Sequence, residues 1–145
     1  MPAKRTLRHI VTGQTLLELE PRASVMDAAK RMAERDVGAA LVQDKGRLVG
    51  IFTERDILNR IVAVGKDPKN TPVGEVMTSP MACCRRDTRL AECKSVMSQK
   101  RIRHLPVVEE GKLYGIISAW DILASEVSDQ QATIEYLHEY LYGRR

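Results

Sequence analysis

The chain contains the same unit twice. Residues 50–58 read GIFTERDIL, and residues 115–123 read GIISAWDIL. The same offset of 65 positions relates Met32 to Met97 and Val42 to Val107, so no gap is needed between the copies. Internal repeats of this kind bury the apolar face of one unit against its neighbour. We therefore expect two half-domains related by a pseudo-two-fold axis, with candidate ligand sites related in the same way.

Each copy has the pattern strand, helix, strand, strand, helix. Ser24 followed by Asp27 is typical of a helix start, and Gly38 is expected to end that helix. Two apolar runs around Gly46 predict a hairpin. The expected elements of the first copy are a strand at 15–19, a helix from 24, strands at 39–42 and 48–52, and a helix from 53 to about 64, closed by Gly65. Those of the second are a strand at 81–84, a helix at 88–100, strands at 104–108 and 113–117, and a helix from 118.

Proline and glycine positions divide the chain into four parts. Pro68 and Pro72 indicate a linker, because proline interrupts both helices and strands. Beyond the second copy, residues 130–142 have the apolar spacing of an extra helix. The expected parts are a first unit at 7–66, a linker at 67–72, a second unit at 73–125 and a C-terminal helical extension at 126–145.

Composition limits the class of protein. Hydrophobic residues make up 43% and charged residues 29%, as in globular domains, while aromatic residues make up only 4%, so the core must be aliphatic. No apolar run approaches the roughly 20 residues that span a bilayer, and no secretory signal precedes the repeat, so no membrane partner is expected. The three cysteines lack zinc spacing, which predicts no metal site and reduced thiols in the cytoplasm. A redox role for Cys83 and Cys84 is the alternative.

The net charge of +4 favours anionic ligands in general. Basic residues are interleaved with acidic ones, and the sequence has no aromatic platform on which nucleic-acid bases would stack. Nucleic acid is therefore not the expected partner.

The second helix of the first copy has a wider apolar face than burial on one side requires. Its apolar residues are Ile57, Leu58, Ile61, Val62 and Val64. In so small a protein part of this face would contact water, and an exposed apolar patch usually marks a partner surface. We expect a homodimer.

The repeated motif places a hydroxyl residue three positions before an aspartate: Thr53 with Asp56, and Ser118 with Asp121. One interpretation is helix capping, because Ser24 and Asp27 show the same local pattern without the glycine. The other is ligand binding. A helix N-terminus attracts anions, a hydroxyl can donate to phosphate or ribose, and a carboxylate can accept from two vicinal ribose hydroxyls. In this interpretation the glycine before the motif leaves space for the ligand.

These features together resemble a tandem pair of CBS domains, also called a Bateman module, over residues 7–125. The resemblance rests on the element order, on the glycine–hydroxyl–aspartate motif in both copies, on RHLPVV at 103–108 and on VGEVMT at 73–78. It implies an α+β fold of two CBS half-domains packed about a pseudo-two-fold axis. It also implies binding of AMP, ADP, ATP, NAD or S-adenosylmethionine in clefts between the halves, with no obligatory cofactor.

The resemblance further implies roles for individual residues. Thr53, Asp56, Ser118 and Asp121 would bind ribose or phosphate. The backbone that contacts the base would come from Ala39, Ala40, Leu41, His104, Leu105 and Pro106. Pro106 lacks an N–H group, which would leave neighbouring backbone groups free to contact adenine.

The two copies differ around these positions. Ala39 and Leu41 correspond to His104 and Pro106. The phosphate candidates are Arg101, Arg103, His104 and Arg55; the alternative is a solvated basic turn. Trp120 either packs at the helix start or stacks on a ligand.

The predicted function is a sensor that binds an adenine nucleotide and regulates an unidentified protein through a change in conformation. The alternative is a ligand-free interaction module that forms a homodimer. The sequence contains no nucleophile–base pair and no Walker-type phosphate loop, so we do not expect an enzyme.

Overall fold

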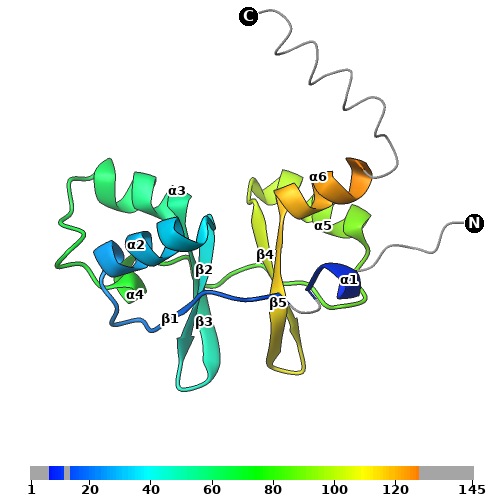
Figure 1. Cartoon of the computed structure of the whole chain (residues 1–145), viewed down its shortest axis with the longest axis horizontal. Coiled ribbons are helices and arrows are strands. Elements are labelled where there is room, and N and C mark those ends of the chain that lie inside the picture. The colour runs from blue at the N-terminus through cyan, green and yellow to red at the C-terminus, as the bar shows by residue number, and fades with distance from the viewer. Residues whose placement is uncertain (1–6, 12–13, 128–145) are drawn as a thin grey trace, which may run out of the picture.

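The computed structural model describes residues 7–11 and 14–127 as two similar halves that lie side by side (Figure 1). The first half contains β1 (Glu18–Leu19), α2 (Val25–Arg35), β2 (Ala39–Asp44), β3 (Arg47–Thr53), α3 (Glu54–Ile57) and the π-helix η1 (Leu58–Val62). The second half contains α5 (Leu90–Lys100), β4 (His104–Glu109), β5 (Lys112–Ser118) and α6 (Ala119–Val127). Two short helices, α1 (Arg8–Val11) and α4 (Val73–Val76), complete the described elements. The expected α+β fold is confirmed.

The first helix of the repeat begins where the sequence predicts and ends earlier. The Ser24 hydroxyl accepts a 3.0 Å hydrogen bond from the Asp27 N–H and so caps α2. The helix ends at Arg35, and its C-cap residue Asp36 has a left-handed φ of 53°, a conformation that aspartate tolerates better than most residues. The expectation that Gly38 ends the helix is therefore wrong. Gly38 instead lies against the Glu54 carboxylate, since a Cβ atom at Gly38 would be 3.0 Å from Glu54 Oε1.

Each half is built around one antiparallel hairpin, as predicted. In the first hairpin Ala39 pairs with Thr53, and the register shifts at Val42/Gln43. In the second, His104 pairs with Ser118, and the register shifts at Val107/Val108. The repeat offset therefore extends to the irregularities of the strands. Both turns pair a left-handed non-glycine residue with a glycine, as two-residue hairpin turns require: Lys45 with Gly46, and Glu110 with Gly111.

The first strand of each copy is shorter than expected, and Pro106 explains part of the difference. In the first half β1 is parallel to β2, and the Leu41 N–H donates a 2.9 Å hydrogen bond to the Leu17 carbonyl. Pro106 occupies the position of Leu41 in the second half and has no N–H to donate. The strand expected at 81–84 is reduced to a single bridge between Cys84 and Val107.

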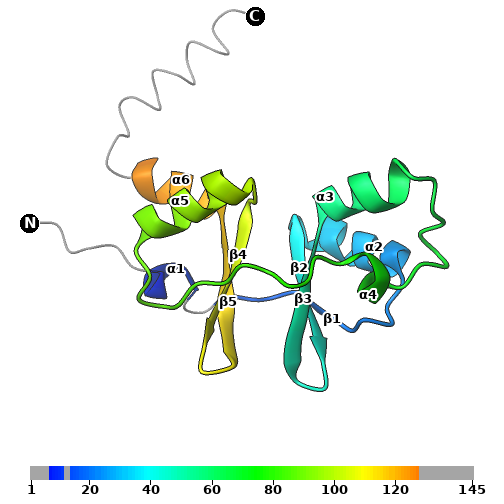
Figure 2. The same ribbon diagram turned by 180° about the vertical axis from the view of Figure 1, so that it is seen from behind.

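The segments that precede each repeat pack on the opposite half. Val11 of α1 is buried in the core of the second half with Leu105 and Ile117. Val76 of α4, which the offset relates to Val11, is buried in the core of the first half with Phe52. Figure 2 shows the chain crossing from α4 to the second half. The two halves are therefore tied together by an exchange of short helices.

The last helix of the repeats begins at Ala119, next to the expected Ser118. The extra helix expected at 130–142 lies outside the described residues. Among the helices that are described, none has the length and apolar character needed to cross a membrane.

Candidate functional site

Two of the clefts that the described residues form between the halves contain the repeated motif. The larger, with a volume of about 640 Å³, is bordered by Ser118 and Asp121 of the second half and by Ala39 and Leu41 of the first. We name it the Asp121 cleft. The smaller, of about 500 Å³, is bordered by Thr53 and Asp56, by the end of α5 and by residues 80–82. We name it the Asp56 cleft. Each cleft therefore combines the motif of one copy with segments of the other.

The repeat relates the two clefts position by position. Ser118 and Asp121 in one correspond to Thr53 and Asp56 in the other. The chemistry differs at other equivalent positions. Asp36 and Trp120 line the Asp121 cleft where the Asp56 cleft has Arg101 and Arg55. The two clefts therefore contain the same motif and differ in the charge of the side chains around it.

Asp56 is the more enclosed of the two motif aspartates. It is 5% exposed. Its Oδ2 accepts hydrogen bonds from the N–H (2.9 Å) and the hydroxyl (3.2 Å) of Thr53. Its Oδ1 accepts from the Thr78 hydroxyl at 3.0 Å and lies 3.7 Å from Nε of Arg60. The capping interpretation thus holds here, and internal partners already occupy both carboxylate oxygens.

Asp121 is half-buried, and its carboxylate accepts fewer hydrogen bonds than that of Asp56. The Ser118 N–H donates a 2.8 Å hydrogen bond to its Oδ2, and the Asp121 N–H donates a 3.1 Å bond to the Ser118 hydroxyl. From the described part of the chain, the Asp121 carboxylate accepts this one bond. A carboxylate offers about four acceptor positions, so Asp121 retains capacity for a ligand that Asp56 lacks.

The glycine of each motif serves the chain rather than a ligand. A Cβ atom at Gly50 would lie 2.5 Å from Met77 Sδ and 3.0 Å from the Thr78 carbonyl. A Cβ atom at Gly115 would lie 2.7 Å from Val11 Cβ. The space that we expected a ligand to use is filled by the end of α1 and by the segment that follows α4, so that interpretation of the glycines is wrong.

The residues expected to contact the base are distributed unevenly. Ala39 and Leu41 line the Asp121 cleft, and His104 lines both clefts. Ala40 and Leu105 are each 1% exposed and belong to the cores of the two halves. Pro106 is also fully buried, and its carbonyl accepts a 2.9 Å hydrogen bond from the Cys84 N–H. Because Pro106 cannot donate, the carbonyl of Ala82, which corresponds to Leu17, receives no bond from it.

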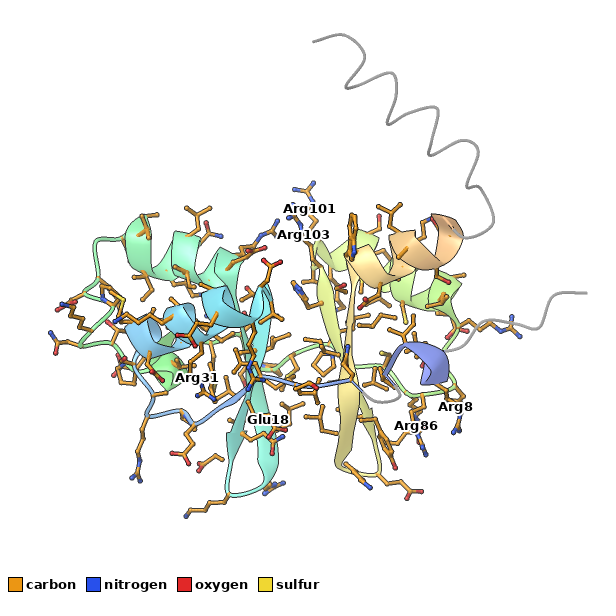
Figure 3. The ribbon with its side chains drawn as sticks, in the orientation of Figure 1. Arg8, Glu18, Arg31, Arg86, Arg101 and Arg103 are labelled. Carbon is orange, nitrogen blue, oxygen red and sulfur yellow. The ribbon has the colours of Figure 1, made fainter. Side chains whose placement is uncertain are left out.

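The phosphate candidates gather at one end of the clefts. Arg55, Arg101 and Arg103 line the Asp56 cleft, and Arg103 also lines the Asp121 cleft. The Arg55 Nη1 donates a 2.7 Å hydrogen bond to the Arg101 carbonyl, which joins the Arg55 side chain to the backbone at the end of α5. Figure 3 shows the side chains of Arg101 and Arg103 extending at the same end of the molecule. Burial lowers the pKa of His104, and Arg103 acts in the same direction.

Several residues that border or support the clefts were not among the predicted site residues, and four of them make or border the polar contacts of the sites. Thr78 and Arg60 hold Asp56, and Glu54 lines both clefts. Gln14 exchanges two 2.9 Å hydrogen bonds with the backbone of Ile116, at the edge of the second hairpin. Only Thr78 had a sequence signal, because it ends the segment VGEVMT.

The surroundings of the cysteines bear on the alternative redox role of Cys83 and Cys84. Cys83 is exposed and Cys84 is buried, and all three thiols are free. The Cys84 Sγ donates a 3.6 Å hydrogen bond to the Pro106 carbonyl, and the neighbouring Cys93 thiol and burial raise the pKa of Cys84. Cys83 and Cys84 therefore lie in different environments, which does not favour a joint redox role.

Comparisons with known proteins agree with this architecture. The family model for the CBS domain matches residues 9–63 and 73–128. The chain is 33% identical over 125 residues to the "CBS domain-containing protein CBSX3, mitochondrial" of Arabidopsis thaliana, covering 83% of this chain and 61% of that protein. A structure of a CBS-domain protein from Burkholderia ambifaria MC40-6 is 36% identical, with a TM-score of 0.83, and covers 87% of this chain and 96% of that one. A hexameric CBS-CP12 protein from bloom-forming cyanobacteria is 30% identical, with a TM-score of 0.79, over 89% of this chain and 77% of that one. The chain thus spans less than two thirds of the Arabidopsis relative.

Proposed function

Because the chain belongs to the CBS domain family, whose paired domains are generally regulatory modules, we propose that it senses adenosine-containing nucleotides. A nucleotide in the clefts shifts the packing of the two halves, and a partner protein responds to the change. The module has no catalytic role in this proposal and needs no cofactor. A cytoplasmic location, in which its free thiols stay reduced, is part of the same proposal.

The observation that carries the proposal is the carboxylate of Asp121, which lies at the edge of a cleft and has free hydrogen-bond acceptor positions. Vicinal ribose hydroxyls are a matching pair of donors for a carboxylate that has spare acceptor positions. The Ser118 N–H already holds this carboxylate at 2.8 Å, so it is oriented before a ligand arrives. A cleft of about 640 Å³ is within the size range of small-molecule sites.

The rest of a nucleotide also has matching partners. In the Asp56 cleft, the Ala82 carbonyl is an acceptor suited to the exocyclic amino group of adenine. Arg101 and Arg103 supply donors for phosphate oxygens, which arginine binds with two parallel hydrogen bonds. Ribose binding at Asp56 requires the Thr78 hydroxyl to share or release its 3.0 Å bond. We therefore expect the Asp121 cleft to bind ribose more strongly and the Asp56 cleft to bind phosphate more strongly.

A thermal unfolding screen with AMP, ADP, ATP, NAD and S-adenosylmethionine tests the proposal, because a ligand of the folded state must raise its stability. AMP has about 23 non-hydrogen atoms, and at about 0.3 kcal/mol per atom its dissociation constant is on the order of 10 μM. At 1 mM, about 100 times that value, AMP should stabilise the fold by about 2.7 kcal/mol. An unchanged unfolding temperature with every compound would reject the nucleotide sensor.

The second candidate is an interaction module that forms a homodimer, and one observation favours it. Leu58, Val62 and Val64 are 59%, 66% and 60% exposed, and Leu123, the repeat equivalent of Leu58, is 49% exposed. Figure 1 shows α3 and α6 on the same side of the molecule. A second copy placed on this side would cover apolar side chains of both halves. The two candidates are compatible, since a dimer can also bind nucleotide.

A further inference from the structure

Of the residues that the structure describes, three line both clefts: Glu54, Arg103 and His104. Their repeat equivalents are Ala119, Gly38 and Ala39, which line the Asp121 cleft alone. The asymmetry has a simple cause. At each of these pairs one copy has a long side chain that reaches both clefts, and the other has a short one that does not. We name Glu54, Arg103 and His104 the shared wall.

The shared wall contains one full positive charge, that of Arg103. Among the described residues, Arg103 is also the only lysine or arginine that lines the Asp121 cleft, which carries three carboxylates: Asp36, Glu54 and Asp121. The Asp56 cleft has three further basic residues, namely Arg55, Lys100 and Arg101. Burial lowers the pKa of His104, so this side chain does not replace the charge of Arg103 at neutral pH.

Building on the proposed function, we propose that Arg103 couples the two clefts, so that an anionic ligand in the Asp56 cleft weakens the binding of a second anion in the Asp121 cleft. The Asp56 cleft fills first with a polyphosphate because it has more basic residues. Its phosphates engage Arg103 and turn that guanidinium away from the Asp121 cleft. A second phosphate group then faces carboxylates with no compensating charge. Adenosine, which has no phosphate, does not depend on Arg103 and binds the Asp121 cleft without this penalty.

Trp120 makes the coupling measurable. It is the only tryptophan of the chain, is 74% exposed and lines only the Asp121 cleft. Its fluorescence therefore reports on that cleft. Lys100 and Arg101 line only the Asp56 cleft, so the double variant Lys100→Ala/Arg101→Gln weakens phosphate binding there and leaves the Asp121 cleft unchanged.

The experiment titrates ATP and adenosine into the unmodified protein and the double variant and follows Trp120 fluorescence, with calorimetry for total binding. We expect the ATP concentration at the midpoint of the Trp120 fluorescence change to be at least fivefold lower in the double variant than in the unmodified protein. A factor of this size is common for coupling between sites. Adenosine should give equal midpoints in both proteins. The matched control is Lys45→Gln/Arg47→Ala, which removes the same charge at exposed positions of the first hairpin. The glutamine replaces a residue with a left-handed φ in both variants, 52° at Lys45 and 54° at Arg101. Arg103→Gln, added to the double variant, should abolish this gain for ATP and leave the adenosine midpoint unchanged, because the Asp121 cleft then has no basic side chain from the described residues.

The outcomes separate the two proposals. Equal ATP midpoints in the unmodified protein and the double variant, or a Trp120 signal that never responds while calorimetry detects binding, would overturn the coupling and leave the nucleotide sensor standing. An equal shift for adenosine and ATP would overturn it as well, because the coupling would not be electrostatic. Absence of binding by any adenosine compound would reject both proposals.

Discussion

The hydroxyl of Thr78 donates a 3.0 Å hydrogen bond to the carboxylate of Asp56. This bond joins the segment after α4 to the capped start of α3. Arg60 supports the same junction, because its Nη1 donates to the carbonyls of Val76 (3.0 Å) and Met77 (2.8 Å). Asp56 therefore holds the fold together, whereas Asp121, which accepts a single bond from the described residues, is available to a ligand.

The first prediction separates these two aspartates by stability. Asp56→Ala leaves the partly buried donors of Thr53 and Thr78 without their acceptor, and we expect a loss of about 3 kcal/mol in the free energy of unfolding. Asp121→Ala removes one capping bond and should cost about 1 kcal/mol. Urea denaturation measures both values. Equal losses in the two variants would contradict the distinction.

The second prediction concerns the glycines of the repeated motif. Gly50→Ala should lose about 2 kcal/mol of stability, because the new Cβ would lie 2.5 Å from Met77 Sδ and the packed segment has to move. Gly115→Ala should behave in the same way against Val11. The control is Gly46→Ala, which meets no atom within 4 Å and carries only the strain of its φ of 80°, a cost of about 1 kcal/mol. Wild-type stability in Gly50→Ala and Gly115→Ala would show that this close packing does not hold the halves together.

The third prediction is a pH dependence that originates at His104. Burial lowers its pKa in the folded state, with Arg103 acting in the same direction and Glu54 and Asp121 opposing. The unfolded chain then binds more protons, so the stability contributed by neutral His104 is complete above its ordinary pKa of about 6.5 and is lost as pH falls below it. His104→Gln should therefore flatten the decrease in unfolding free energy between about pH 7 and pH 5. Identical pH profiles for the two proteins would remove His104 from this account.

The fourth prediction tests the apolar side formed by α3, η1 and α6. Leu58→Glu and Leu123→Glu place charges at positions that are 59% and 49% exposed, so each folded half should tolerate them. A dimer that buries these positions should dissociate, because an unpaired buried carboxylate costs several kcal/mol. Sedimentation velocity gives the oligomeric state. The control is Arg47→Glu on the exposed hairpin turn, and a dimer that survives both leucine substitutions would place the interface elsewhere.

Local elements could be predicted from sequence because their signals lie within a few residues. The cap formed by Ser24 and Asp27, the turns at Gly46 and Gly111, and the repeat offset each predicted an element that the structure contains. The end of α2 was misjudged because Asp36, rather than Gly38, adopts the left-handed conformation.

Relations between distant segments could not be predicted in this way. The packing of α1 on the second half and of α4 on the first depends on contacts across the whole chain, such as the one between Gly115 and Val11. The same is true of the bond between Thr78 and Asp56. The two copies have the same motif, so the sequence suggested equal roles for Asp56 and Asp121, and only their partners distinguish them.

A calorimetric titration of AMP into three proteins tests the central claim most directly. These are the unmodified chain, Asp121→Ala, and Asp27→Ala as a matched control, since Asp27 follows a capping hydroxyl by three residues but lines neither cleft. We predict that Asp27→Ala binds AMP as the unmodified chain does and that Asp121→Ala loses at least tenfold in affinity, as expected for a hydrogen bond to a charged group. Equal AMP affinity in Asp121→Ala and the unmodified chain would contradict the claim that this carboxylate binds the ribose.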